Sequence, residues 1–447
     1  MSESTTSAQI LYGAETTKAV HNFAISGQPV PMSVVHWLAR IKGAAATVNA
    51  RLGKLDVGVA AAITAAADEV VAGRYDDQFP VDVFQTGSGT STNMNVNEVI
   101  SALTGGVAHP NDHVNMGQSS NDTFPSAVHL AALDAVQRRL LPALDHLASA
   151  LEAKSVEFHD VVKAGRTHLM DAVPITLGQE FGGYGAQVRL GIERISATLD
   201  RVGQIPLGGT AVGNGLNTPA EFASMVRGVV VDLTGLRHVG APLDHFEAQA
   251  NRDALVELSG ALRGLAVSLT KIAQDIALMG SGPRAGIGEL VLPSLQKGSS
   301  IMPGKVNPVM AEVVLQVAAQ VIGNDTAITI GGMQGQFELN VRVPLIARNL
   351  LESIDLLTNS TTAFADKCIA GLAVNPAGTE RGAHGTLAVA TALNEHIGYD
   401  LATKIVAAAA DSGRPLREVA IEAGVDADLY DSVIDLRRIA AGNEPLA

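Results

Sequence analysis

Residues 296–312, QKGSSIMPGKVNPVMAE, gather side chains that could carry out proton-transfer chemistry. They comprise two adjacent serines, a lysine, an asparagine and a glutamate: Ser299, Ser300, Lys305, Asn307 and Glu312. Glycine and proline punctuate the first half, which predicts a loop. Asn307-Pro308 then predicts a helix start, with Asn as the N-cap and Pro at the first helical position. Free N–H groups and the helix dipole favour negative charge at such a place, so the segment predicts an anion site.

Two further polar blocks lie earlier in the chain. Residues 86–98, TGSGTSTNMNVNE, open with a tight turn, rich in backbone N–H groups, that contains Ser88 and Thr90. This turn could hold an anion, but it lacks the GK[ST] ending of a nucleotide P-loop. The second block, Ser119-Ser120-Asn121-Asp122, precedes a helix expected from about residue 126 to 160. Simple helix initiation would explain both blocks, and N-capping and anion binding can share one geometry.

A third block contains a histidine that is a candidate for proton transfer. Residues 164–180, AGRTHLMDAVPITLGQE, place Arg166, Thr167 and His168 in a turn bounded by glycine and proline. A lone histidine in such a turn is usually structural or simply exposed. Imidazole can also move protons near neutral pH, so His168 is a candidate acid or base.

Long helices must position these blocks. One stripe repeats at alternating spacings of three and four, as in a coiled-coil seam: Leu255, Leu258, Leu262, Leu265, Leu269, Ile272 and Ile276. A helix from about 250 to 279 would be about 45 Å long. It would end at residues 280–283, GSGP. Similar stripes at 130–147 and 177–202 predict two more long helices, and such helices should bundle, both within a subunit and between subunits.

The pattern predicts an all-α protein of three domains. We expect a mostly helical N-terminal domain at 1–118, a central helical bundle at 119–374 and a small helical C-terminal domain at 375–447. The 447 residues are 47% hydrophobic but only 4% aromatic, which favours closely packed helices over an aromatic-rich β-sandwich.

Net charge and cysteine content indicate which partners and which cellular compartment to expect. The formal net charge is −14 with no run of Lys or Arg, so we expect neither nucleic acid nor an anionic membrane as a partner. Cys368 is the single cysteine, which precludes an intrachain disulfide and a cluster needing several thiolates, and fits a reducing compartment. The N-terminus lacks the pattern of a signal peptide, and no uncharged apolar run reaches about 18 residues. We therefore expect a cytoplasmic protein without a membrane span.

Several motifs of other enzyme classes are absent from the sequence, and one reaction type remains. No HExxH, paired cysteines or dense carboxylate cluster predicts a metal, and no dinucleotide fingerprint or GxSxG elbow occurs. We therefore expect no cofactor. Proton abstraction beside a carboxylate, with elimination across the neighbouring C–C bond, remains. Its carbanion adds negative charge, so the site needs a fixed cation and hydrogen-bond donors, which Lys305 and Asn307 could supply.

The blocks together resemble the fumarase/aspartase superfamily, and most of all the class II fumarase family. GSSIMPGKVNP is similar to its signature loop, TGSGTSTNMNVNE to its first block and GRTH to its histidine block. The resemblance implies that Ser299 takes the carbon proton, with its alkoxide stabilised by Lys305 and the loop amides. It implies that His168, paired with Glu312, handles the water. It also implies a set of substrate contacts: Ser88, Thr90, Ser119, Ser120, Asn121, Thr167, Ser300, Lys305 and Asn307.

The same resemblance implies more about architecture. Superfamily members form homotetramers around a 20-helix core, and each site draws its blocks from three subunits. The stretch HPND resembles a secondary dicarboxylate site near the entrance, formed here by His109, Asn111 and Asp112. The segment before it is shorter than in most fumarases and lacks their basic residue, so a plain turn remains the alternative. A glycine-rich turn after Leu207 is implied to support the site.

The resemblance implies reversible hydration of fumarate to L-malate in the tricarboxylic acid cycle. His168 favours water over ammonia, because aspartases usually have Gln there, and Gly304 follows the fumarase pattern. Val173 and the NPVMAEVV run are more typical of aspartases. Aspartate ammonia-lyase is therefore the alternative, followed by a catalytically inactive member, whose motifs would be broken.

Overall fold

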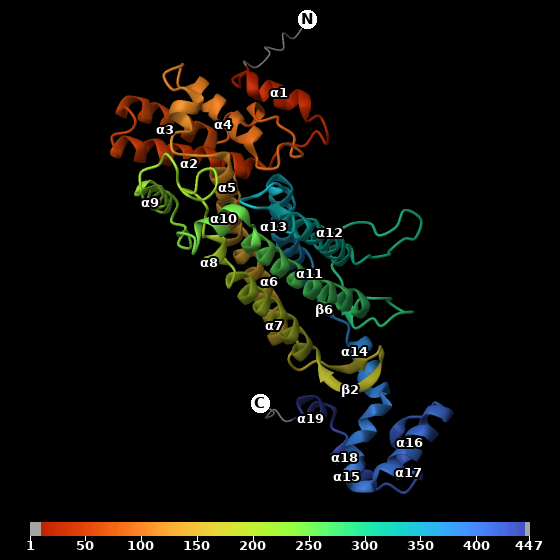
Figure 1. Ribbon diagram of the computed structural model, residues 1–447. Coiled ribbons are helices and arrows are strands. Elements are labelled where there is room, and N and C mark those ends of the chain that lie inside the picture. Colours follow the sequence, from red (N-terminus) through yellow and green to blue (C-terminus); the bar gives the residue numbers. More distant parts are fainter. Residues whose placement is uncertain (1–9, 443–447) are drawn as a thin grey trace, which may run out of the picture. The chain divides into compact units, whose positions relative to one another are not determined.

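The computed structural model describes residues 10–442, which are mostly helical (Figure 1). Three two-stranded antiparallel sheets accompany the helices: β1-β2, β3-β6 and β4-β5. The predicted all-α class is confirmed, with these short hairpins and pairings as additions. The chain divides into two compact units, each made of three separate segments. The domain boundaries expected at 118 and 374 stay predictions.

The first unit consists of Met1–Pro142, Gly191–Ala266 and Ala318–Thr358. Two of its helices begin at candidate site residues, α4 (Thr90–Leu103) and α5 (Ser120–Ala135), and both pack against α2 (Met32–Arg51). Its smaller elements are α1 (Ala14–Asn22), α3 (Val57–Val71), η1 (Asp76–Gln78), η2 (Pro110–Val114), η3 (Val136–Leu140), α8 (Leu199–Val202), α9 (Phe222–Thr234), α10 (His245–Ala250), β4 (Gly335–Gln336) and β5 (Leu339–Asn340).

The second unit consists of Ala143–Leu190, Val267–Val317 and Asn359–Ala447. Its elements up to residue 393 are α6 (Leu141–Glu157), β1 (Val162–Thr167), β2 (Met170–Thr176), β3 (Leu290–Val291), η4 (Ile369–Gly371), β6 (Ala373–Val374), α14 (Pro376–Gly385) and η5 (Leu387–Leu393). Five short helices follow: α15 (Asn394–Ile397), α16 (Tyr399–Ser412), α17 (Leu416–Glu422), α18 (Ala427–Val433) and α19 (Leu436–Ala441). From Val389 onward they enclose a small apolar core that includes Leu393, Ile405 and Ala420.

Five helices have residues in both units. Helix α6 has only Leu141 and Pro142 in the first unit, and the other four are α7 (Leu177–Ser196), α11 (Asp253–Met279), α12 (Val309–Gly332) and α13 (Val343–Lys367). Helix α11 confirms the strongest periodicity in the sequence. All seven residues of its predicted stripe, from Leu255 to Ile276, are at most 1% exposed. An apolar stripe at three-four spacing buries one face of a helix, and the structure uses that face as core.

Two helical stretches are divided by local features. Residues 32–71 form α2 and α3 rather than one helix, with Gly53 in the left-handed region (φ 66°) and Asp56 capping α3 through the N–H groups of residues 58 and 59. The helix expected at about 126–160 begins earlier, at Ser120, and contains the π-helical turn η3 just before Pro142. A π-turn is a known cause of helix bending, and this one lies directly before Pro142, where a proline inside a helix also favours a kink.

Helix α12 has an unusually exposed apolar surface. Among the described helices it is the one long and apolar enough to cross a membrane by length and composition, although only 33% of its most apolar window is buried. Glu312 and Asp325 interrupt it, and core helices of proteins without any membrane span pass the same test. Val313, Ile322 and Ile330 are between 37% and 51% exposed. Exposed apolar side chains gathered on one helix are typical of surfaces through which proteins associate.

Candidate active site

Three hydroxyl groups meet at the first residues of α4 and α5. Ser88 Oγ lies 2.8 Å from Thr90 Oγ1, which lies 2.9 Å from Ser120 Oγ. Helix α4 begins at Thr90 and α5 at Ser120, so both helix N-termini open at this cluster. Free N–H groups and the positive ends of the helix dipoles add to the hydroxyl donors. The structure thus brings together three of the predicted substrate-binding residues in a setting that suits a carboxylate.

Two glycines allow the turn before α4 to lie this close to its surroundings. A Cβ on Gly87 would lie 1.7 Å from the carbonyl oxygen of Val341, and one on Gly89 would lie 2.2 Å from the ring of Phe124. Gly89 also has φ of 77°, which residues with a Cβ rarely adopt. Close packing of this backbone turn against α5 and residue 341 therefore explains why the TGSGT segment has glycine at two positions.

The start of α5 is fixed by a buried carboxylate. Ser119 and Asp122 form a capping box, in which Asp122 accepts from the Ser119 N–H at 2.9 Å. Asp122 also accepts two N–H groups of the turn at 208–211, at 3.0 and 2.9 Å, and Asn121 Nδ2 donates to a carbonyl of that turn at 3.0 Å. Burial raises the pKa of Asp122 to about 6. The glycine-rich turn after Leu207 therefore packs against the Ser-Ser-Asn block.

His168 lies at the tip of a β-hairpin rather than in an irregular turn. Strands β1 and β2 pair so that Thr167 faces Met170, which leaves His168 and Leu169 as a two-residue connection. Both have positive φ, 55° and 61°. Two consecutive positive φ values are typical of the type I′ turns that match the twist of paired strands. The side chains of Thr167 and His168 are exposed, so both are available to a molecule outside their own unit.

The loop at 296–307 supplies two backbone donors to the hydroxyl of Ser299. Ser299 Oγ accepts from the N–H groups of Ile301 at 3.2 Å and Met302 at 3.0 Å. The base of the loop is closed by Gly298 N donating to Lys305 O at 3.1 Å and by Asn307 Nδ2 donating to Gly298 O at 2.7 Å. Donors aimed at a hydroxyl oxygen stabilise its anion, so this geometry favours a serine alkoxide.

The loop and the following helix agree in outline with the sequence prediction. Ser294 and residues 296–306 line a hollow of about 740 Å³, and the lining residues Ser300 and Lys305 are exposed. Helix α12 begins at Val309, directly after Asn307-Pro308. Glu312 lies in its first turn and is exposed.

One predicted pairing does not occur within a single chain. In the described residues 10–442, no hydrogen bond or ion pair joins His168 to Glu312. The hydroxyl cluster belongs to the first unit, whereas His168, Ser299, Lys305 and Asn307 belong to the second. The roles given to these residues therefore stay predictions.

The predicted secondary site is a self-contained turn. His109 caps the π-helical turn η2, accepting from Asp112 N at 3.1 Å through Nδ1, and its Nδ1 also lies 3.2 Å from the Asp112 carboxylate. His113 Nδ1 accepts from His109 N at 3.0 Å. His109, Asn111 and Asp112 are exposed, so the turn is accessible, and its ligand stays a prediction.

A buried polar network behind α5 was missed by sequence reasoning. Lys42 on α2 is fully buried, and its Nζ lies 3.3 Å from Asn115 Oδ1 and from Gln118 Oε1. Burial lowers its pKa to about 7, against the attraction of Asp122. Asn93 Nδ2 on α4 also donates to Asn115, at 3.2 Å. The available signal was the repetition of asparagine at alternate positions of α4: Asn93, Asn95 and Asn97.

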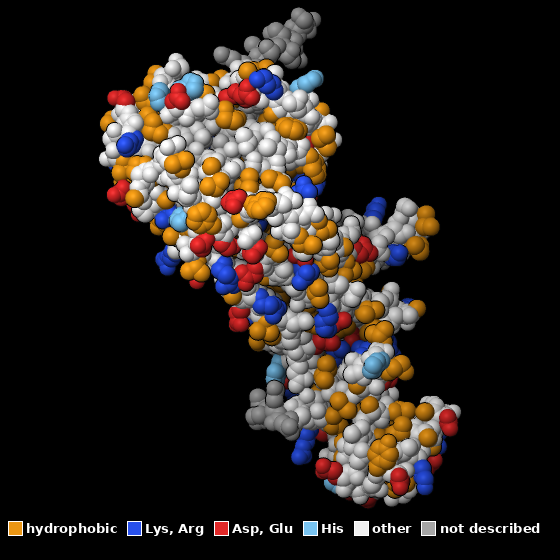
Figure 2. All heavy atoms as spheres, in the orientation of Figure 1, with side chains coloured by type: hydrophobic (Ala, Val, Ile, Leu, Met, Phe, Trp, Pro, Cys, Tyr) orange, Lys and Arg blue, Asp and Glu red, His pale blue; other side chains and the backbone are white. Residues whose placement is uncertain are grey.

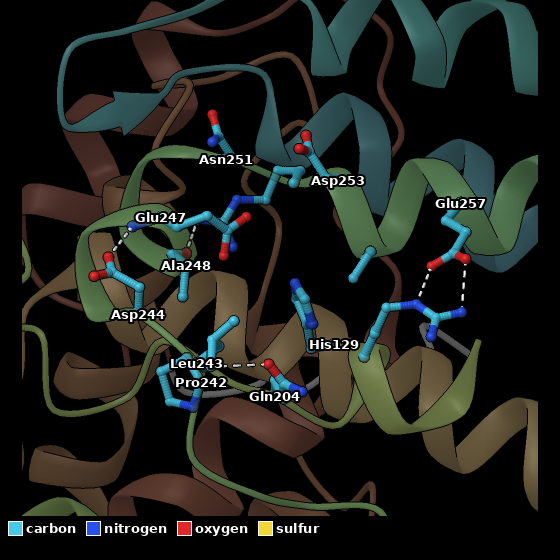
Figure 3. A pocket seen from close by; sticks show the side chains of 13 residues that line it. His129, Gln204, Pro242, Leu243, Asp244, Glu247, Ala248, Asn251, Asp253 and Glu257 are labelled. Carbon is cyan, nitrogen blue, oxygen red and sulfur yellow. Dashed lines mark hydrogen bonds and ion pairs between the residues drawn. The ribbon is translucent and has the colours of Figure 1, made fainter. Parts of the chain in front are cut away.

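A separate cavity of about 520 Å³ lies beside α5, α8 and the start of α11 (Figure 3). His129 Nδ1 lies 2.8 Å from Val202 O, and its Nε2 has no protein partner among the described residues. Burial and the nearby charge of Arg252 lower the pKa of His129 to about 3, so this imidazole is neutral. None of the residues predicted for the active site is found in the described lining of this cavity.

Comparisons with known proteins agree with one another. A family model described as lyase matches residues 2–323, and one described as fumarase C C-terminus matches residues 389–441. A class II fumarate hydratase of Mycobacterium tuberculosis is 54% identical over 441 residues, which are 98% of this chain and 93% of the relative. The mitochondrial fumarate hydratase of Rattus norvegicus is 51% identical, with 94% and 85% covered.

Solved structures show the same fold. A class II fumarase from Schistosoma mansoni superposes with a TM-score of 0.94 at 39% identity, covering 97% of this chain and 96% of that one. A fumarate lyase:delta crystallin from Brucella melitensis gives 0.89 at 42%, with 96% of each chain covered. The fold and the blocks define a helical lyase of the fumarase type. Within that class, the chain belongs to the class II fumarate hydratase family.

Proposed function

We propose that the protein catalyses the reversible hydration of fumarate to L-malate, a step of the tricarboxylic acid cycle. The observation that carries the chemistry is the position of Ser299 Oγ, which accepts two backbone N–H groups in the 296–307 loop. A hydroxyl held in this way can act as a base next to a carboxylate. The family membership selects the hydratase reaction, and His168 rather than Gln at the hairpin tip agrees with it.

In the malate-to-fumarate direction, Ser299 alkoxide takes the proton from the carbon beside one carboxylate. The electron pair left on that carbon is delocalised into the carboxylate, where Lys305 and Asn307 offer a charge and a donor. The pair then forms the C=C bond as the hydroxyl leaves the neighbouring carbon. His168, paired with Glu312, gives that hydroxide a proton, so water departs. Hydration runs through the same steps in reverse.

The second carboxylate has its own set of donors. We assign it to the hydroxyl cluster of Ser88, Thr90 and Ser120, with Ser119, Asn121, Thr167 and Ser300 completing the contacts. Two helix N-termini at one cluster suit a fixed negative charge. The substrate is therefore a small dicarboxylate. The accessible turn at His109, Asn111 and Asp112 could hold a second dicarboxylate outside the site.

We infer that the sites form between subunits of a homotetramer. The exposed apolar surface of α12 supports association, and Figure 2 shows many further hydrophobic side chains on one face of a single chain. We assign the His168–Glu312 pair to different subunits, since no bond joins the two within one chain. A cytoplasmic location fits the lone, buried Cys368.

One pair of assays tests the function. Purified protein is mixed with L-malate and, in parallel, with L-aspartate, and the ultraviolet absorbance of fumarate is followed. Formation of fumarate from malate alone is expected. Formation from aspartate alone would instead support an ammonia-lyase, for which Val173 and the NPVMAEVV run are the sequence arguments. No fumarate from either substrate would support the inactive-member alternative.

A further inference from the structure

Four charged side chains, two buried and two about one-fifth exposed, form a cluster at the β1-β2 hairpin. Arg166 places Nη1 and Nη2 at 3.0 and 2.8 Å from the two oxygens of Glu289. Lys163 Nζ lies 2.9 Å from Glu180 and 3.4 Å from Glu289. Glu289 is fully buried and the Lys163 side chain is 2% exposed. All four residues belong to the second unit.

Such a cluster is poor evidence of a purely stabilising role. Removing charges from water carries a desolvation cost that two cations and two anions only partly recover, and apolar residues of similar volume often stabilise a fold as well. What a bidentate Arg–carboxylate pair supplies in addition is a fixed geometry. The function of the pair is therefore indicated by the part of the chain whose position it fixes.

The Arg166–Glu289 fork fixes the strand that ends at His168. Arg166 is two residues before His168 on β1, and the register shifts between Ala164 and Arg166, so strand pairing alone is irregular there. Beyond Arg166 the hairpin is exposed, and its two turn residues have positive φ. The fork is the last buried anchor before the imidazole.

The other end of the fork is itself held from two directions. Glu289 N donates to Met279 O, at the end of α11, at 2.8 Å. Glu289 O accepts from Asn375 N, directly before α14, at 2.9 Å. Glu289 also lies ten residues before Ser299 in the chain. A carboxylate fixed in this way can set the position of a neighbouring hairpin.

We propose that Arg166 and Glu289 are positioning residues for proton transfer by His168. The inference rests on the proposed role of His168. The fork holds β1 so that the imidazole at the tip meets the leaving hydroxyl, and a misplacement of about 1 Å at such a group can lower a rate by about 10²-fold. Glu289 acts through Arg166 and does not touch the substrate.

The first experiment compares Arg166→Lys and Glu289→Gln with the wild type in the malate reaction. Lysine keeps the charge but cannot form a fork, so this variant tests geometry with the smallest effect on folding. We expect kcat to fall by about 10²-fold with KM changed by less than about threefold. Arg417→Lys is the matched control, because Arg417 forms an exposed fork with Asp431 at 2.7 and 2.7 Å; its kcat should stay at the wild-type value.

The second experiment places Arg166→Lys in a His168→Asn background. If the fork acts through His168, the double variant is no slower than His168→Asn alone, because the positioned group is already absent. Losses that multiply, or a wild-type kcat in Arg166→Lys with an intact oligomer, would overturn the positioning role and leave the proposed function standing. A wild-type kcat in His168→Asn would reject the role of His168, and this inference with it.

Discussion

The hydroxyl oxygens of Thr90 and Ser120 lie 2.9 Å apart, so the first residues of α4 and α5 are joined by a hydrogen bond. The two residues are thirty positions apart in sequence, and each opens a helix. A carboxylate at this point would meet two hydroxyls and two sets of free N–H groups at once.

Replacing Thr90 by Val should weaken substrate binding. The change keeps the shape of the side chain and removes the hydroxyl, and a hydrogen bond to a charged group contributes about 1.5–3 kcal/mol. KM for malate and for fumarate should rise by about 10- to 100-fold, measured by initial rates. Thr403→Val, at an exposed hydroxyl of α16, is the control and should leave KM unchanged. An unchanged KM in Thr90→Val would remove this cluster from the site.

Ser299→Ala and His168→Asn should each lower kcat by about 10² to 10⁴-fold, the usual size of an acid–base contribution. In the first variant the N–H groups of Ile301 and Met302 lose the oxygen that they stabilise. Steady-state kinetics in both directions measures the loss. His396→Asn, in the short helix α15, is a control expected to retain full kcat. A variant that keeps the wild-type kcat would show that its residue takes no part in proton transfer.

Chelation should leave the activity unchanged. Lys305, the hydroxyls and the helix N-termini can meet the charge of both carboxylates, so the proposed steps need no metal or nucleotide. The measurement is the malate reaction before and after dialysis against EDTA. Activity that is lost on dialysis and restored by one added metal would show that the proposed set of residues is incomplete.

His129 should make stability depend on pH. Its pKa is lowered from 6.5 to about 3 in the folded protein, mainly by burial. The unfolded chain therefore binds a proton that the folded chain does not, so stability is retained above pH 6.5 and falls as the pH drops toward 3. Asp122, whose pKa is raised to about 6, has the opposite dependence, so the two contributions must be separated by substitution.

His129→Gln provides that separation. The variant should be less stable than the wild type at pH 7, because the hydrogen bond of Nδ1 with Val202 O is altered. Its thermal midpoint should fall less than that of the wild type between pH 7 and pH 5, which differential scanning calorimetry can measure. An equal fall in both proteins would mean that His129 is not the group responsible.

The sequence predicted the features that depend on local patterns. The stripe of α11 is read from spacing alone, and the hydroxyl turns and the 296–307 loop follow from glycine, proline and capping residues. The β1-β2 hairpin was expected only as a turn, because its strands are short and their pairing depends on two positive-φ residues. Glu289 and Lys42 could not be identified, since their burial depends on partners that are distant in the sequence: Arg166 precedes Glu289 by 123 positions, and Asn115 follows Lys42 by 73.

We propose that residues of several subunits act on one dicarboxylate. The most direct test co-expresses His168→Asn and Ser299→Ala subunits with different affinity tags and purifies oligomers that contain both. If His168 and Ser299 of one site come from different subunits, random mixing leaves about a quarter of the sites intact. We expect the mixed oligomers to convert malate at about this fraction of the wild-type rate, while each variant alone is nearly inactive. Mixed oligomers as inactive as the single variants would contradict it.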